Sequence, residues 1–178
     1  MTYRELGIKG AFVITLDTIV DSRGFFARAW DAHELAEHGL ESRFVQSNVT
    51  FNTRRGTVRG MHFQRAPHEE VKLVRCTRGS VLDVIVDIRD GSPTRLKWES
   101  VELSADNRLM VYVPRGLAHG YQTLEDASEV SYHVSEYYHP ESEGALLWND
   151  PALGIAWPVR DTILSEKDRN AAPLSAQR

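Results

Sequence analysis

Short hydrophobic runs separated by turn residues recur along the whole chain. The runs are rich in Val, Ile, Thr and aromatic residues, and they predict strands at residues 11–16, 43–48, 57–63, 72–76, 80–88, 97–103, 109–113 and 129–135. Gly, Pro, Asn and Asp lie between them, as at residues 90–93 and 105–107. Many short strands at regular spacing predict a mainly β protein, a sandwich or barrel of the jelly-roll kind.

Helix signals are confined to one or two short segments. Residues 31–38 have a helical pattern, with Asp31 and Glu34 placed as a capping box and Gly39 as the stop signal. Near the C-terminus, Ser165 followed by Asp168 repeats the capping pattern and predicts a short helix or a turn.

Composition limits the class of protein. With 178 residues, 42% of them hydrophobic, and no internal repeat or linker, the chain is expected to form a single domain over residues 1–178. The net charge of −4 has both signs interspersed, which argues against nucleic-acid and membrane partners. The start lacks an apolar signal core, and the single cysteine, Cys76, cannot form an internal disulfide, so a cytoplasmic location is expected.

Residues 59–75 bring three chemically capable side chains close together in sequence. His62, Gln64 and Lys72 fall on two adjoining predicted strands, and they share a face if those strands pair. An imidazole can remove a proton next to a carbonyl, and an ammonium can stabilise the enolate oxygen that results. Tyr132, in the strand-like run 129–135, can return a proton from the opposite face.

Each of these residues also has a purely structural interpretation. His62 can be a satisfied strand histidine, Lys72 a solvated charge at a strand edge, Tyr132 ordinary packing, and Asp168 only a helix cap.

A metal site at His62 is disfavoured by the neighbouring residue types. Residues 56–62 and 114–119 resemble the two halves of the cupin signature, whose metal-binding members want a second histidine two residues after the first. That position holds Gln64, a poor ligand, and Lys72 brings a positive charge towards the proposed cation. We therefore expect no metal at this site.

A longer series of motifs points to one family. In order along the chain they are Asp21-Ser22-Arg23-Gly24-Phe25-Phe26, Arg59-Gly60-Met61-His62-Phe63-Gln64, Lys72-Leu73-Val74, residues 83–89 followed by Gly91-Ser92-Pro93-Thr94, residues 114–120, Trp148-Asn149-Asp150-Pro151 and Ile155-Ala156-Trp157-Pro158. The series resembles the dTDP-4-dehydrorhamnose 3,5-epimerase family, a metal-independent branch of the cupins. The similarity runs from about Phe12 to Asp168, and it implies a cupin-type jelly roll, or double-stranded β-helix.

The resemblance implies a reaction and assigns roles. The substrate would be a nucleotide diphospho-4-keto-6-deoxyhexose, epimerised at C3 and C5 without a cofactor, in deoxysugar biosynthesis. His62 matches the family's general base, Lys72 the group near O4 that stabilises the enolate, and Tyr132 the acid on the opposite face. Asp168 matches the carboxylate that orients the base, and His119 a supporting active-site histidine.

The resemblance also implies a set of substrate-binding residues, namely Arg23, Phe26, Arg28, Gln46, Asn48, Arg59 and Tyr138. Arg23 and Arg59 match positions that bind the pyrophosphate, where planar guanidinium donors suit phosphate oxygens. Tyr138 is placed to stack on a base or sugar face. Family members are homodimers that exchange N-terminal strands, so a homodimer is expected.

Two positions depart from the family pattern. The family often has Asn-x-Ser-x-Ser where this chain has residues 48–52, Asn-Val-Thr-Phe-Asn. Many thymidine-specific members carry a glutamate at the position of Arg28, and a guanidinium cannot accept the thymine N3 hydrogen as a carboxylate can. We hypothesise altered or relaxed base recognition, for example towards a CDP-linked 4-keto sugar.

Three alternatives remain at this point. A C3-only epimerase would share the same motifs. A metal-dependent cupin oxygenase is opposed by the missing second histidine. A non-catalytic sugar-nucleotide binding module is opposed by the combination of His62, Lys72, Tyr132 and Asp168, since binding alone needs no matched base and acid.

Overall fold

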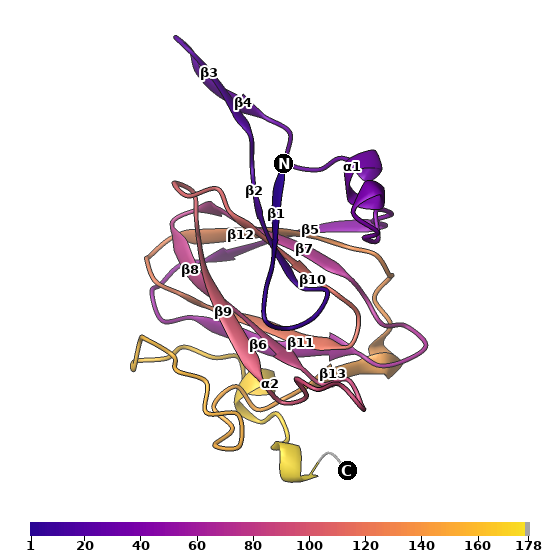
Figure 1. The fold of residues 1–178 in the computed structure, drawn as a ribbon. Coiled ribbons are helices and arrows are strands. Elements are labelled where there is room, and N and C mark those ends of the chain that lie inside the picture. Colours follow the sequence, from indigo (N-terminus) through magenta and orange to yellow (C-terminus); the bar gives the residue numbers. More distant parts are fainter. Residues whose placement is uncertain (177–178) are drawn as a thin grey trace.

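Two antiparallel sheets face each other and form the body of the protein (Figure 1). The computed structural model describes residues 1–176. In sheet order, the six-stranded sheet consists of β1 (Thr2–Glu5), β2 (Phe12–Thr15), β10 (Met110–Val113), β7 (Lys72–Arg78), β12 (Ser128–Val134) and β5 (Gln46–Asn52). The five-stranded sheet consists of β13 (Glu143–Ala145), β6 (Val58–Gln64), β11 (Leu117–Thr123), β8 (Ser80–Asp87) and β9 (Trp98–Ser104). The predicted jelly-roll architecture is confirmed.

The core lies between the sheets because alternate residues of each strand point inward. Val74, Val130, Val81 and Ile85 are among its buried members, and Tyr132 packs against them. A second cluster joins helix α1 (Ala32–Glu37) to the six-stranded sheet, and a third joins the C-terminal segment to the five-stranded sheet. These clusters cover part of the outer face of each sheet, while Val49 and Phe51 on β5 are exposed.

The predicted helices are present and short. Asp31 caps α1 by accepting hydrogen bonds from the backbone N–H groups of His33 and Glu34. The second half of the predicted capping box is wrong, because the Glu34 carboxylate instead pairs with the amino group of Met1. Helix α2 (Glu166–Arg169) is capped by the Ser165 hydroxyl. Two short 3-10 helices, η1 (Pro140–Ser142) and η2 (Leu174–Ala176), complete the helical content of the described residues.

One strand-pairing expectation is wrong. The strands that carry His62 and Lys72, β6 and β7, do not pair with each other; they belong to opposite sheets. β6 pairs with β11 and β13, whereas β7 pairs with β10 and β12. The two side chains therefore meet across the space between the sheets and not along one strand pair.

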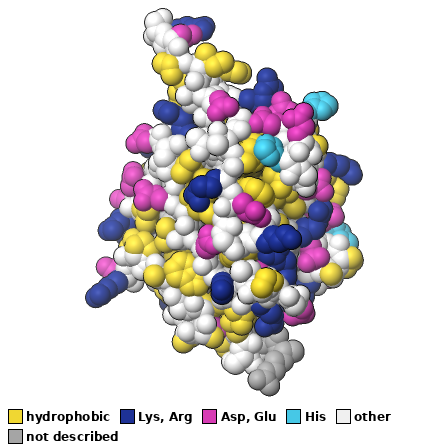
Figure 2. Space-filling model, in the orientation of Figure 1, with side chains coloured by type: hydrophobic (Ala, Val, Ile, Leu, Met, Phe, Trp, Pro, Cys, Tyr) yellow, Lys and Arg dark blue, Asp and Glu magenta, His cyan; other side chains and the backbone are white. Residues whose placement is uncertain are grey.

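The hydrophobic pattern also missed a hairpin. β3 (Thr18–Asp21) and β4 (Gly24–Ala27) pair with each other alone and extend away from the two sheets (Figure 1). Ile19, Val20, Phe25 and Phe26 are exposed on it. In the sequence they stand as two adjacent apolar pairs, not in the apolar and polar alternation that predicts a half-buried strand. Figure 2 shows hydrophobic side chains on this projection, while charges of both signs are interspersed over the rest of that face.

The helices of the described residues are all short. None of them is long and apolar enough to cross a membrane.

Candidate active site

A cavity of about 250 Å³ opens between the two sheets. Its lining comprises Gln46, Asn48, His62, Phe63, Gln64, Glu70, Lys72, Tyr132, Val134, Tyr138 and Glu143. His62 enters from the five-stranded sheet, whereas Lys72 and Tyr132 enter from the six-stranded sheet. The fold thus gathers around one space the three groups that proton abstraction and return require.

His62 is held by a carboxylate. Its Nε2 lies 2.6 Å from Oδ1 of Asp168, which α2 presents. Burial raises the pKa of Asp168, but the hydrogen bond and charge of His62, together with hydrogen bonds from Ser165 and the Gly60 backbone, lower it more, so this carboxyl remains ionised. A carboxylate at Nε2 holds the proton there and leaves Nδ1 as the basic atom. The arrangement suits His62 to act as a base.

The strand that carries His62 is bent next to it. The pairing of β6 with β11 places His62 opposite His119 but shifts register before Arg59 pairs with Tyr121. Gly60 lies within the shift with φ near +145°, and a Cβ there would come 2.6 Å from the Cα of Gly120. Glycine at this position permits the close approach of the two strands.

Lys72 and Tyr132 face the cavity from neighbouring strands. The Lys72 Nζ lies 3.1 Å from Oε1 of Glu70, and both side chains are largely buried. Burial is the main cause of a raised pKa at Tyr132, so its phenol keeps its proton at neutral pH. No hydrogen bond holds the Tyr132 hydroxyl within residues 1–176, which leaves it available to a ligand. A cation and a neutral proton donor therefore stand across the cavity from the His62 imidazole.

Comparison with known proteins identifies the family. The model of the dTDP-4-dehydrorhamnose 3,5-epimerase family matches residues 5–176. This chain belongs to that family. It is 44% identical over 173 residues to the dTDP-4-dehydrorhamnose 3,5-epimerase of Methanothermobacter thermautotrophicus, covering 96% of this chain and 92% of the relative. The predicted family and epimerase class are confirmed.

Two solved structures frame the similarity. The dTDP-4-dehydrorhamnose 3,5-epimerase of Bacillus anthracis, solved with TDP and PPi bound, is 40% identical with a TM-score of 0.95, covering 97% of this chain and 99% of that one. A 3'-monoepimerase from Streptomyces bikiniensis in complex with dTDP-quinovose is 35% identical with a TM-score of 0.90, covering 96% and 86%. The same fold therefore occurs in double and single epimerases.

A second histidine–aspartate pair lies beside the first in this epimerase. His119 Nε2 is 2.7 Å from Oδ2 of Asp83, and both side chains are buried. His119 does not line the cavity, although β11 places it directly opposite His62 in the strand pairing. His119 therefore lies where it can support the strand that carries His62.

Three of the seven predicted substrate-binding residues line the cavity, and four do not. Gln46, Asn48 and Tyr138 line the cavity as expected. Arg59 lies outside its lining, where its Nε donates to Oδ1 of Asn52 at 2.8 Å.

The remaining three predicted residues are not brought to the cavity within one chain. Arg23 and Phe26 are exposed on the β3–β4 hairpin, and Arg28 follows that hairpin and pairs with Asp31 at 3.5 Å. The hairpin projects away from the two sheets, so these residues do not reach the cavity of their own chain (Figure 1).

Sequence reasoning missed three carboxylates around the site. Glu70 pairs with Lys72, Glu143 lines the cavity and accepts from the Tyr138 hydroxyl at 3.3 Å, and Asp83 holds His119. The signal available for Glu70 was its position two residues before Lys72, the residue at which β7 begins. Glu143 and Asp83 come from distant strands, so only the fold reveals them.

Gln64 proves to be a structural residue. Its amide nitrogen donates to the carbonyls of His68 and Tyr137 at 2.9 and 3.0 Å, and its oxygen accepts from the His139 N–H at 2.7 Å. It thereby joins the segment before β7 to the segment after β12, and both segments border the cavity.

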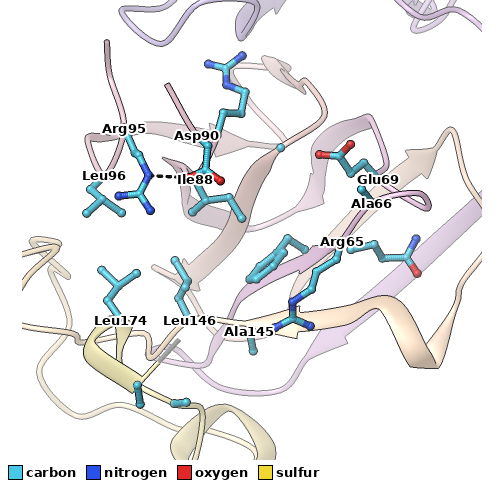
Figure 3. Close-up of a pocket in the computed structure, with 16 residues that line it drawn as sticks. Arg65, Ala66, Glu69, Ile88, Asp90, Arg95, Leu96, Ala145, Leu146 and Leu174 are labelled. Carbon is cyan, nitrogen blue, oxygen red and sulfur yellow. Dashed lines mark ion pairs between the residues drawn. The ribbon is translucent and has the colours of Figure 1, made fainter. Parts of the chain in front are cut away.

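A larger hollow of about 720 Å³ lies around Phe63 and Leu146 (Figure 3). Its lining includes Arg65 and the ion pair of Arg95 with Asp90 at 3.3 Å, but no histidine or tyrosine. Because it lacks a histidine that faces a lysine and a tyrosine, we assign the chemistry to the smaller cavity.

Proposed function

We propose that this protein epimerises a nucleotide diphospho-4-keto-6-deoxyhexose of the dTDP-4-dehydro-6-deoxyglucose type at C3 and C5. The observation that carries the proposal is the placement of His62, Lys72 and Tyr132 around one cavity from opposite sheets. Membership of the epimerase family supports the substrate class.

Proton abstraction is the first step. The C4 ketone acidifies the hydrogens at C3 and C5, and Nδ1 of His62 takes one of them as a proton while the electron pair moves into an enolate. The Asp168 carboxylate stabilises the imidazolium that forms.

The enolate oxygen requires a positive group. Lys72 supplies an ammonium at O4, and the confined cavity makes its charge more effective than it is in water. Glu70 holds that ammonium in place at 3.1 Å.

Proton return completes the inversion. Tyr132 donates its phenolic proton to the face opposite His62, and the enolate collapses to the ketone with the new configuration. The His62 imidazolium then loses its proton to solvent and the Tyr132 phenolate regains one from solvent, after which the same steps occur at the second carbon, and no step requires a cofactor.

We propose further that two subunits complete each other's substrate site. The exposed apolar residues of the β3–β4 hairpin would be covered by a second copy of the chain. Exchange of this hairpin would carry Arg23, Phe26 and Arg28 to the partner's nucleotide, with Arg23 on the pyrophosphate. Light scattering should give a dimer, and Arg23→Ala should raise KM without dissociating it. A monomer with full activity would contradict this arrangement.

The nucleotide base remains the least constrained part of the substrate. Arg28 is exposed and cannot accept a hydrogen bond from thymine, which favours relaxed recognition that extends to CDP sugars. Similar affinities for the dTDP and CDP forms would support this, whereas a strong dTDP preference in the wild type would refute it. We place the enzyme in the cytoplasm, in keeping with the biosynthetic role of its family.

Deuterium incorporation tests the reaction directly. The protein is incubated with dTDP-4-keto-6-deoxyglucose in deuterated water without added metal, and C3 and C5 are followed by proton NMR. Exchange at both carbons is expected. Exchange at C3 alone would instead favour a C3-only epimerase. The Streptomyces bikiniensis 3'-monoepimerase, which has a similar fold, is an enzyme of that kind.

A further inference from the structure

A cluster of metal-ligating side chains lies at the border of the cavity but outside its lining. His68, Glu136 and His139 each offer one ligand atom, and these atoms lie within 4.8 Å of one another. All three residues are partly buried, and the side chains of Glu136 and His139 are about 30% exposed. We propose that each subunit binds one divalent transition-metal ion here, separately from the catalytic cavity and independently of the proposed reaction.

The spacing is close to that of a metal centre. The His139 Nε2 lies 3.9 Å from Oε1 of Glu136. Bonds of about 2.0–2.1 Å to a tetrahedral Zn²⁺ separate two ligand atoms by roughly 3.3–3.5 Å. Oε1 of Glu136 also accepts from the Tyr137 N–H at 2.8 Å, and a shift of about half an ångström in the two side chains brings this pair to ligand spacing.

His68 must turn to join them. Its ring is stacked on that of His139 with centroids 3.5 Å apart and an interplanar angle of 9°. Two parallel imidazoles cannot both direct an in-plane lone pair at one ion. No hydrogen bond holds the His68 ring within residues 1–176, whereas Glu141 accepts from His139 Nδ1 at 3.0 Å. Rotation of the unrestrained His68 ring is therefore the step that completes the site.

The contact to Glu141 favours metal binding for a second reason. A ligating histidine commonly uses its other ring nitrogen to bond a carboxylate, which fixes its orientation and raises its basicity. Glu141 leaves His139 Nε2 facing Glu136 in just this way.

The backbone already holds the ligands together. The Gln64 side chain bonds the His68 carbonyl and the His139 N–H, so the two segments that carry the ligands are joined without an ion. Because these two segments are joined in advance, only the His68 ring and small side-chain shifts remain to be ordered, and less conformational entropy is lost on binding.

The ligand types indicate which ions bind. Two imidazoles and one carboxylate suit Zn²⁺, Co²⁺ or Ni²⁺, whereas Mg²⁺ and Ca²⁺ prefer oxygen ligands alone. Water would fill the remaining position, because three protein ligands leave a tetrahedral ion one short.

The ion's consequence would be to fix the border of the cavity. Tyr138 lies between Glu136 and His139 in the chain, and Glu70 follows His68 by two residues; both Tyr138 and Glu70 line the cavity. The ion would link the two segments that carry them and would take no part in proton transfer.

Titration of the full-length, tag-free protein with ZnCl₂ tests the site. After dialysis against a chelator, calorimetry should give one Zn²⁺ per subunit, no heat with MgCl₂, and a higher Tm with Zn²⁺ than without. His68→Ala and His139→Ala should lose this binding, and Glu141→Gln should weaken it about 10- to 100-fold. Co²⁺ should show the visible bands of a tetrahedral site in the wild type and not in the two histidine variants.

Two matched controls separate this site from others. His33→Ala removes an exposed histidine of α1, and His62→Ala removes the cavity histidine; both should bind Zn²⁺ as the wild type does. A single cooperative melt of each metal-free variant excludes misfolding. No saturable Zn²⁺ binding, binding that survives in His68→Ala and His139→Ala, or binding lost in His62→Ala would overturn the proposal.

Discussion

The protein contains two histidine–aspartate pairs that differ in little except their surroundings. His62 and Asp168 are joined at 2.6 Å, and His119 and Asp83 at 2.7 Å. The His62 side chain is 33% exposed and lines the cavity, whereas that of His119 is 8% exposed and does not. Hydrogen bonding alone therefore does not make a base; a second ring nitrogen must also reach the substrate space. We expect His62 to act on substrate and His119 to support the strand beside it.

After removal of His62 itself, the largest effect should come from the cation across the cavity, which only the His62 pair faces. Lys72→Met removes the charge that meets the enolate oxygen, so kcat should fall about 10²- to 10³-fold. Steady-state kinetics measure this, and Lys97→Met, at an exposed lysine, is the control. A Lys72→Met variant with the kcat of the wild type would contradict the proposal that the cation facing the His62 pair stabilises an enolate.

The next effect concerns the proton donor opposite His62. Tyr132→Phe keeps the base and the cation but removes the phenolic proton, so solvent exchange should persist while net inversion drops. Proton NMR in deuterated water reports both quantities in one sample. Equal loss of exchange and inversion would contradict the assignment, and Tyr137→Phe, at an exposed tyrosine, should change neither.

Loss of the buried His119–Asp83 pair should lower the free energy of unfolding. Asp83 Oδ1 already lacks a hydrogen-bond partner within the described residues, so His119→Ala would leave the whole carboxylate unpaired. This should cost about 1–3 kcal/mol in the free energy of unfolding. Urea denaturation measures it, with His62→Ala as the matched variant. A larger stability loss in His62→Ala than in His119→Ala would reverse the proposed roles.

The smallest effect is a pH dependence of stability at the cavity pair. Burial raises the pKa of Asp168, but His62, Ser165 and the Gly60 backbone together lower it more, so the folded pKa lies below the unfolded value of about 3.9. The ionised carboxylate thus stabilises the fold above about pH 4, and this stabilisation is lost as the pH falls through the lower folded pKa. Asp168→Asn should therefore lose less stability than the wild type on acidification below pH 4. Parallel melts from pH 6 to pH 3 compare the two, and identical slopes would exclude this linkage.

The hydrophobic pattern predicted most of the fold because most strands bury one face. The strands at β7, β8 and β12 alternate or are continuously apolar, and their expected ranges match the structure closely. The β3–β4 hairpin was missed because its apolar residues are exposed in a single chain. In the proposed dimer a second molecule would bury these residues, and no local pattern reveals such a contact.

The candidate site was predicted in part, for a different physical reason. Motif resemblance marked His62, Lys72 and Tyr132, and the structure brings them to one cavity. The resemblance did not show that His62 and Lys72 approach from opposite sheets, because sheet pairing depends on contacts between distant segments. Partners such as Asp83 were invisible for the same reason.

Deuterium exchange in His62→Ala tests the central claim most directly. With His119→Ala as the parallel sample and dTDP-4-keto-6-deoxyglucose as substrate, His62→Ala should lose exchange at both C3 and C5, a fall of about 10²- to 10⁴-fold. His119→Ala should retain exchange in the fraction that remains folded. Near-normal exchange in His62→Ala would contradict the account, because the base would then lie elsewhere.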